Sequence, residues 1–281
     1  MQIQPFHRGP ADSQRQIGIF LLCVAFFGFD LTPLRADVVI APHRAAYTLE
    51  LKRMGRDSTV SDASGAMVYS WGETCDGWTV EQQFLLNVVQ ANGNPISLTA
   101  VSSTWESKDG KRLRFNIKRE RNGSEVEKIR GEGRLESVGG AGEAEFELPV
   151  VKRIKLPAGT VFPTMHTLRL MARAQDGART DRQIVFDGSE VEPPGPVSAF
   201  ILPLKTPAEK NEALTPPLGP DKVRNIHLAF FGLDTRSAEP EFEMSIELQD
   251  NGVAPSLILD YGEYAVRASL VRIEALEKPD C

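Results

Sequence analysis

Apolar and polar residues alternate along several stretches of this chain, and this alternation is the strongest constraint on its fold. In Tyr47–Lys52, Arg112–Lys118 and Glu241–Leu248, every second side chain is apolar and the intervening ones are polar or charged. Successive side chains of a β-strand point to opposite faces, so each stretch has one dry face and one wet face. One-sided burial is typical of antiparallel sheet. The sequence therefore predicts a mainly β protein.

Turn-forming dipeptides separate the alternating stretches. Asparagine or aspartate followed by glycine readily adopts the positive φ angles that tight hairpins require. From Trp78 to Glu136 these signals predict about four strands joined by hairpins, a meander of long strands. A further long strand is expected at Tyr261–Glu277, interrupted early by Gly262. The four dipeptides are Asn92-Gly93, Asp109-Gly110, Asn122-Gly123 and Asn251-Gly252.

One segment follows the helical period instead. Pro163 suits the first turn of a helix and Gly177 suits its end, so a helix is predicted over residues 163–176. Its expected apolar stripe contains Met165, Leu168 and Ala172.

A second stripe of the same helix contains His166, Arg169 and Arg173, at spacing i, i+3, i+7. These three side chains could receive a phosphate or a carboxylate. The alternative is the ordinary solvated face of an amphipathic helix.

The N-terminal residues 1–36 resemble a secretion signal peptide. A weakly basic start precedes the uncharged apolar run Ile17–Phe29, and cleavage is expected after Ala36. This run is shorter than the roughly 20 residues that a bilayer-spanning helix needs. An uncleaved N-terminal anchor is the alternative. Residues 37–281 are then expected to form a single exported domain without a transmembrane span.

Charge and loop composition agree with one soluble β domain. The formal net charge of −6 argues against nucleic acid as a partner. The segment Thr206–Pro220 is polar, contains four prolines, and is expected to be an exposed excursion of that domain.

Two cysteines remain outside the signal region, Cys75 and Cys281. In an exported chain such a distant pair is most simply a structural disulfide. The alternative is a redox switch or a thiol enzyme, although the chain has no Cys-x-x-Cys motif.

Two further groups are candidates for binding. Trp71 and Trp78 flank Cys75 and could form an aromatic shelf, or they could simply pack around a hairpin. Arg112, Arg114 and Lys118 share one face of a predicted strand and could hold an anionic polymer or lipid headgroup. A solvated strand face explains the same three residues.

Signals for catalysis, metals and cofactors are weak. The sequence contains no Gly-x-Ser-x-Gly, phosphate-binding glycine loop or His-Glu-x-x-His motif. No His, Cys, Asp and Glu residues have the spacing of a metal site. We therefore expect no catalytic residues, no metal and no cofactor.

Several short segments together resemble one family. They are Ala41–Tyr47, Cys75–Trp78, Phe162–His166, Phe186–Glu190 and the cysteine at position 281. Over about Val39–Cys281 the chain resembles the cell-envelope integrity protein EipB family, also called DUF1849, of alphaproteobacteria.

The resemblance implies a periplasmic, non-enzymatic protein that keeps the cell envelope intact under stress from detergents or cell-wall antibiotics. It implies a highly bent, spiral-like antiparallel sheet of about 12–14 strands with one packed helix. It also implies a disulfide between Cys75 and Cys281.

Three functions remain open from the sequence. The first is binding of an envelope protein, lipoprotein or lipid by a monomer. The second is a hydrolase or transferase that uses His43, His166 or His227 with the acids of Asp187–Glu190. The third is a structural scaffold on the cell wall.

Overall fold

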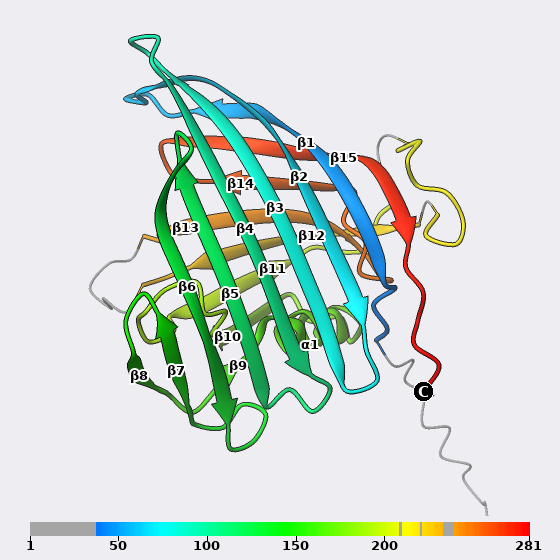
Figure 1. Ribbon diagram of the computed structural model, residues 1–281. Coiled ribbons are helices and arrows are strands. Elements are labelled where there is room, and N and C mark those ends of the chain that lie inside the picture. Colours follow the sequence, from blue (N-terminus) through cyan, green and yellow to red (C-terminus); the bar gives the residue numbers. More distant parts are fainter. Residues whose placement is uncertain (1–37, 208–209, 220, 233–238) are drawn as a thin grey trace, which may run out of the picture. The chain divides into compact units, whose positions relative to one another are not determined.

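The computed structural model describes residues 38–207, 210–219, 221–232 and 239–281. Its regular structure is almost entirely β, with one helix (Figure 1). The predicted signal peptide lies outside the described residues.

The described elements follow one another from residue 43 to residue 275. Their bounds are β1 His43–Met54, β2 Val60–Glu73, β3 Gly77–Gln90, β4 Pro95–Ser107, β5 Arg112–Arg121, β6 Ser124–Leu135, β7 Gly142–Leu148, β8 Lys152–Leu156, β9 Thr160–Val161, α1 Pro163–Gln175, β10 Thr180–Val185, β11 Pro196–Ile201, β12 Val223–Phe230, β13 Phe242–Gln249, β14 Ser256–Asp260 and β15 Tyr264–Ala275.

All of these strands belong to one sheet, in the order β8-β7-β6-β5-β4-β3-β2-β1-β15-β14-β13-β12-β11-β10-β9. The prediction of a single, mainly antiparallel sheet is confirmed. The sheet has 15 described strands, which is more than the family resemblance implied. The pairing of the two-residue β9 with β10 is parallel, and the other strand pairs are antiparallel. A strand of two residues is too short to show an alternation of apolar and polar side chains, so the sequence did not predict it.

The predicted hairpin turns connect consecutive long strands in the first half of the sheet. Asn122 and Gly123 connect β5 to β6 with φ angles of 52° and 76°. Two consecutive positive φ angles turn the chain with the twist that antiparallel strands need. The other three dipeptides also lie in turns between paired strands. The predicted C-terminal strand is confirmed as β15, with Gly262 in the turn before it.

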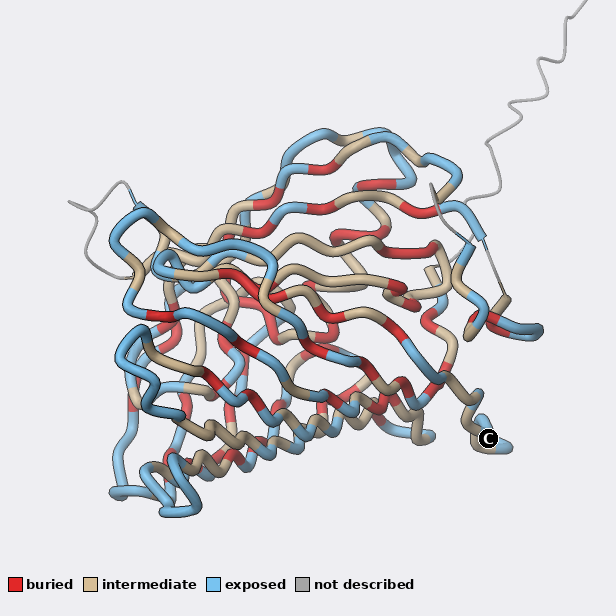
Figure 2. The backbone as a smooth tube through the Cα atoms, turned by 90° about the horizontal axis from the view of Figure 1, so that it is seen from above, coloured by how far each residue is buried: buried red, intermediate tan, exposed pale blue. Residues whose placement is uncertain are grey.

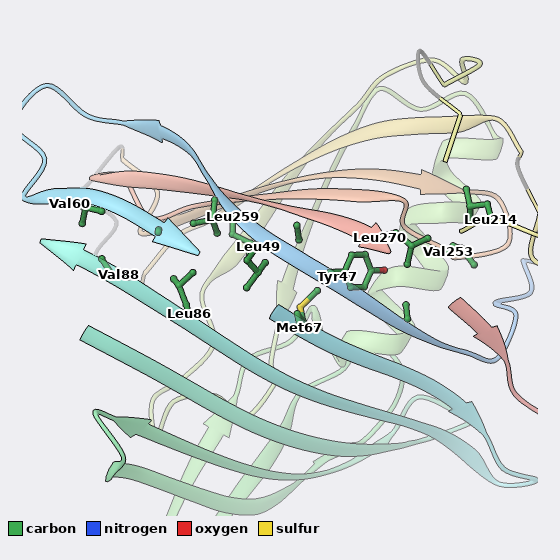
Figure 3. Close-up of a cluster of buried hydrophobic side chains, with 14 of the residues drawn as sticks. Tyr47, Leu49, Val60, Met67, Leu86, Val88, Leu214, Val253, Leu259 and Leu270 are labelled. Atoms are coloured by element: carbon green, nitrogen blue, oxygen red, sulfur yellow. The ribbon is translucent and has the colours of Figure 1, made fainter. Parts of the chain in front are cut away.

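The sheet curls, so that strands β2–β6 face strands β10–β14 across an interior that contains α1 (Figure 1). Buried and exposed positions alternate along the strands, most regularly in β1 and β5 (Figure 2). The buried positions of β1–β3 and β14–β15 form one hydrophobic cluster, including Tyr47, Leu49 and Met67 (Figure 3). The Tyr47 hydroxyl donates to the Ala254 carbonyl at 2.9 Å.

Helix α1 confirms the prediction for residues 163–176. Its Leu170, Met171 and Ala174 pack in a second cluster with residues of β11–β13. The predicted apolar stripe was displaced, because Met165, Leu168 and Ala172 are only partly buried. The strands around the helix determine which of its faces is buried. The sequence of the helix alone does not identify those strands.

A third cluster lies where α1 begins. Phe162 is fully buried and contacts the ring of Phe186, which also meets Phe115 and Phe146. A Cβ at position 133 would lie 3.0 Å from the Phe162 ring, so glycine in β6 makes room for it. This cluster fixes the start of the helix against β5–β7.

The segment Thr206–Pro220 is not simply the exposed excursion that we predicted. Leu214 and Leu218 are buried in the first hydrophobic cluster. Asn211 also donates its side-chain N–H to the Leu270 carbonyl at 3.1 Å. The described part of this segment is therefore anchored to β15 despite its polar, proline-rich composition.

Candidate functional site

The outer face of β5 carries two arginines over one tryptophan. Trp105 of β4 lies directly across the strand pair from Arg114. The guanidinium carbons of Arg114 and Arg112 lie 5.0 Å and 6.0 Å from the centroid of the Trp105 ring. We call these three residues the guanidinium site. Cation–π contact of this kind holds a guanidinium in place while leaving its N–H groups in water.

Lys118 belongs to the same strand face but not to the guanidinium site. Its Nζ lies 2.6 Å from a carboxylate oxygen of Glu120 and 3.8 Å from one of Glu125. The structure therefore separates the three predicted cations into two arginines over Trp105 and one lysine paired with acids.

The two tryptophans near the disulfide do not form a common shelf. Trp71 is buried in the cluster that contains α1, and its indole N–H has no hydrogen-bond partner among the described residues. Trp78 is partly buried, and the Lys108 ammonium lies 4.7 Å from the centroid of its ring. Lys108 also pairs with Glu73. Their placement agrees with packing around the β2–β3 hairpin.

A buried carboxylate caps helix α1. The helix has no side-chain cap at Phe162 and no acid in its first turn. Glu106 of β4 takes that role, because its two carboxylate oxygens accept the backbone N–H groups of Thr164 at 2.7 Å and Met165 at 2.9 Å. The first N–H groups of a helix otherwise have no partner within it. Glu106 thus ties the start of the helix to the end of β4.

Burial raises the pKa of Glu106 to about 7, and the hydrogen bonds from Thr164 and Met165 act in the opposite direction. Only 2% of the residue is exposed. A group with this pKa could exchange protons near neutrality. Since solvent and substrate have no access to it, we assign it a structural role.

The predicted anion-binding stripe on α1 was wrong in one of its three members. His166 is buried, and burial lowers its pKa to about 4. It is therefore uncharged near neutral pH. Arg173 is exposed and lies 3.8 Å from the Asp181 carboxylate, while Arg169 reaches the side chain of Gln183 at 3.4 Å. Arg169 and Arg173 thus reach side chains of β10, while Arg173 also remains exposed to solvent.

Among the described residues, His43 and His227 do not form a catalytic group with the Asp187–Glu190 acids. His43 is buried, its Nδ1 lies 2.7 Å from the Ala41 carbonyl, and burial lowers its pKa. His227 is exposed on the outer face of β12, with its Nδ1 2.7 Å from Ser245 Oγ. Asp187 accepts the backbone N–H of Ser189 in a polar turn.

Within the described residues, no group of three or more His, Cys, Asp or Glu side chains could hold a metal ion. The same part of the chain contains no helix long and apolar enough to cross a membrane.

A disulfide joins Cys75 and Cys281, whose Cα atoms are 5.7 Å apart. Both cysteines are exposed. Cys75 lies in the β2–β3 turn, and Cys281 ends an irregular tail that follows β15. The tail's Leu276 N–H donates to the Pro42 carbonyl at 2.9 Å. The bond therefore fastens the tail to the tip of a hairpin on the other side of β1.

Three exposed apolar side chains lie on neighbouring strands of the outer face. They are Val68 of β2, Leu85 of β3 and Val101 of β4, with 37%, 41% and 44% of their surface exposed. Gln83 pairs across the strands with both valines. We call these three residues the apolar strip. A cleft of about 310 Å³ beside it is lined by Arg44, Val68, Ser70, Glu81 and Gln83.

Sequence reasoning missed Trp105 and Glu106, which are adjacent in β4. The stretch Ser102–Thr104 before them is uniformly polar, so it gives no alternation that would assign their faces. The one available signal was the predicted pairing of β4 with β5, which places Trp105 opposite Arg114 once the register is known.

Comparison with known proteins agrees with this fold. The cell envelope integrity protein EipB of Brucella abortus (strain 2308) is 28% identical over 241 residues, covering 84% of this chain and 85% of that protein. The crystal structure of a beta-barrel-like protein of domain of unknown function DUF1849 from Brucella abortus superposes with a TM-score of 0.79. It is 26% identical and covers 85% of this chain and 100% of its own.

The family model described as EipB-like matches residues 35–277, which is most of the sequence and includes every strand of the described sheet. The chain therefore belongs to the EipB-like family.

Proposed function

We propose that this protein is a non-enzymatic periplasmic factor that maintains the integrity of the cell envelope by binding a protein, lipoprotein or lipid component of it. The name of the Brucella relative supports the envelope role. Resistance to detergents and cell-wall antibiotics is the stress phenotype that we expect.

The apolar strip is the observation that carries the binding proposal. Val68, Leu85 and Val101 keep their side chains in water on three adjacent strands of a regular sheet. Exposed apolar side chains grouped in this way favour burial against a partner. The adjacent cleft adds Arg44 and Glu81, which could orient that partner through polar contacts.

A deletion strain complemented with variants tests the proposal. Val68→Thr, Leu85→Thr and Val101→Thr combined keep strand-forming residues and remove apolar surface. We expect this triple variant to accumulate normally and fail to restore growth on detergent and a cell-wall antibiotic. Val126→Thr, on β6 and 61% exposed, is the matched control.

Two results would count against the proposal. Full rescue by the triple variant would exclude the apolar strip as the binding surface. A deletion strain with normal resistance would exclude the envelope-stress role itself.

The exposed pair His227 and Ser245 motivates a hydrolase as the second candidate. A serine nucleophile needs a histidine as its base, a group that orients this histidine, and an enclosed site for the substrate. Neither His227 nor Ser245 lines the cleft beside the apolar strip or the cleft formed by residues of β6, β7 and β8. Ser245→Ala should complement the deletion fully, and loss of rescue with normal protein levels would favour the hydrolase.

A further inference from the structure

We propose that the guanidinium site, formed by Arg112, Trp105 and Arg114, binds a phosphate monoester on the outer face of the sheet. None of its residues belongs to the apolar strip. The two proposals can therefore fail separately.

Several cations on β5 and β6 are paired with carboxylates. Lys118, Arg119, Arg130 and Arg134 each have a carboxylate partner, in Glu120, Glu127, Glu147 and Glu132. Within the described ranges, Arg112 and Arg114 form no ion pair with any carboxylate. Exposed Lys128 of β6 and Arg121 of β5 likewise have no carboxylate partner among the described residues. What distinguishes Arg112 and Arg114 is that both guanidinium groups lie over one indole ring.

Trp105 holds both arginines of the guanidinium site in place. Both side chains are exposed, and both guanidinium groups lie within 6.0 Å of the same indole centroid. Stacking on Trp105 reduces the side-chain entropy that a flexible arginine would lose on binding a ligand. The acid across from Arg114 is Glu132, which already accepts a hydrogen bond from Arg134.

The charge and the oxygens of a phosphate monoester suit two adjacent guanidinium groups. A phosphate monoester carries a charge of roughly −1.5 to −2 near neutral pH and has three terminal oxygens. It can therefore accept N–H groups from both guanidinium forks at once. A carboxylate has two oxygens and one charge, which a single arginine satisfies. The pair of forks thus favours phosphate over carboxylate.

Glycerol 3-phosphate is the soluble probe, and acetate at matched ionic strength is the carboxylate control. The indole N–H resonance of Trp105, identified by its loss in Trp105→Phe, reports binding in ¹⁵N NMR spectra. We expect a saturable shift with glycerol 3-phosphate and little with acetate. Arg112→Gln and Arg114→Gln should each weaken binding at least about tenfold. Arg130→Gln, which removes an exposed arginine paired with Glu147, should bind like the parent protein.

Arg112→Lys combined with Arg114→Lys separates a built site from a simple positive field. This variant keeps both charges and removes both planar forks, so we expect it to bind weakly. Binding as tight as in the parent protein would overturn the proposal. An equal response to acetate, or no saturable shift with glycerol 3-phosphate together with no vesicle binding, would also overturn it.

Vesicles distinguish the source of the phosphate. Sedimentation with phosphatidylcholine vesicles containing phosphatidic acid, but not with phosphatidylcholine alone, would identify a lipid headgroup. A response to glycerol 3-phosphate without sedimentation would identify a soluble phosphate ester. Either result must disappear in the Arg112→Gln and Arg114→Gln variants for the proposal to stand.

Discussion

The Glu106 cap of helix α1 and the guanidinium site both place charged side chains on β4 and β5, but in opposite environments. Glu106 points inward from β4, where two helix N–H groups satisfy it in a dry environment. Trp105, the preceding residue, points outward and holds two arginines in water. A buried charge must find its partners within the fold. An exposed charge can be left for a ligand at little cost.

The disulfide lies outside both regions and provides a reference for their stability. Cys75→Ser should lower the free energy of unfolding by up to about 5 kcal/mol in the chain-entropy model, because the bond closes a very long loop. Little is lost in the folded state, since β15 stays paired with β1 and β14. Thermal melting and protease resistance with and without reductant measure the effect. Equal stability of the oxidised and reduced forms would contradict a structural role.

Glu106→Ala should be the most destabilising single substitution at the start of helix α1. It removes the acceptors of two buried N–H groups and leaves a small cavity. We expect a loss of about 2–4 kcal/mol in urea unfolding. Glu81→Ala, which changes an exposed glutamate on neighbouring β3, should have little effect. Similar losses of stability in Glu106→Ala and Glu81→Ala would contradict the difference between the inner and outer faces.

Glu106→Gln should change the pH dependence of stability while keeping much of the cap. Burial raises the pKa of Glu106 from 4.5 to about 7, so the folded protein holds this proton after the unfolded chain has lost it. The stability contributed by this group is therefore fully present below about pH 4.5 and is lost as the pH rises to about 7. The loss amounts to at most about 3 kcal/mol.

His166 opposes this trend, because burial lowers its pKa to about 4 and acid therefore favours the unfolded chain. Only the difference between the parent protein and Glu106→Gln isolates the glutamate. That difference in unfolding free energy, measured from pH 4.5 to pH 8, should grow with pH in favour of the glutamine variant. Parallel curves would mean that Glu106 is ionised throughout, held by the two helix N–H groups.

Changes at the guanidinium site should have the smallest effect on stability. Arg112→Gln and Arg114→Gln each remove an exposed cation–π contact, which contributes about 0.5–1 kcal/mol at most. We expect urea midpoints close to that of the parent protein. A large loss would show that these arginines serve the fold, as Glu106 does.

The sequence was informative where structure is local. Alternation in β1, β5 and β13, the Asn-Gly turns, and the Pro163 and Gly177 boundaries of α1 all predicted elements that the structure contains. Local patterns could not predict which distant residues meet. The cap of α1 comes from a strand 58 residues earlier in the chain, and the burying face of the helix depends on β11–β13. The polar stretch in β4 and the two-residue length of β9 left no alternation of apolar and polar side chains from which these parts could be predicted.

The order of the strands also has a consequence for how fast the chain can fold. Every neighbouring pair in the described sheet joins strands that are consecutive in the sequence, except β1 and β15. Most of these pairs are hairpins, which form quickly because short loops close at low entropic cost. The exceptions are the parallel β9–β10 pair, which is joined through α1, and the β11–β12 pair, which is joined by residues 202–222. The slow, long-range search is concentrated in the single seam between β1 and β15. We expect mutations within that seam to slow refolding more than equally destabilising mutations in the outer hairpins.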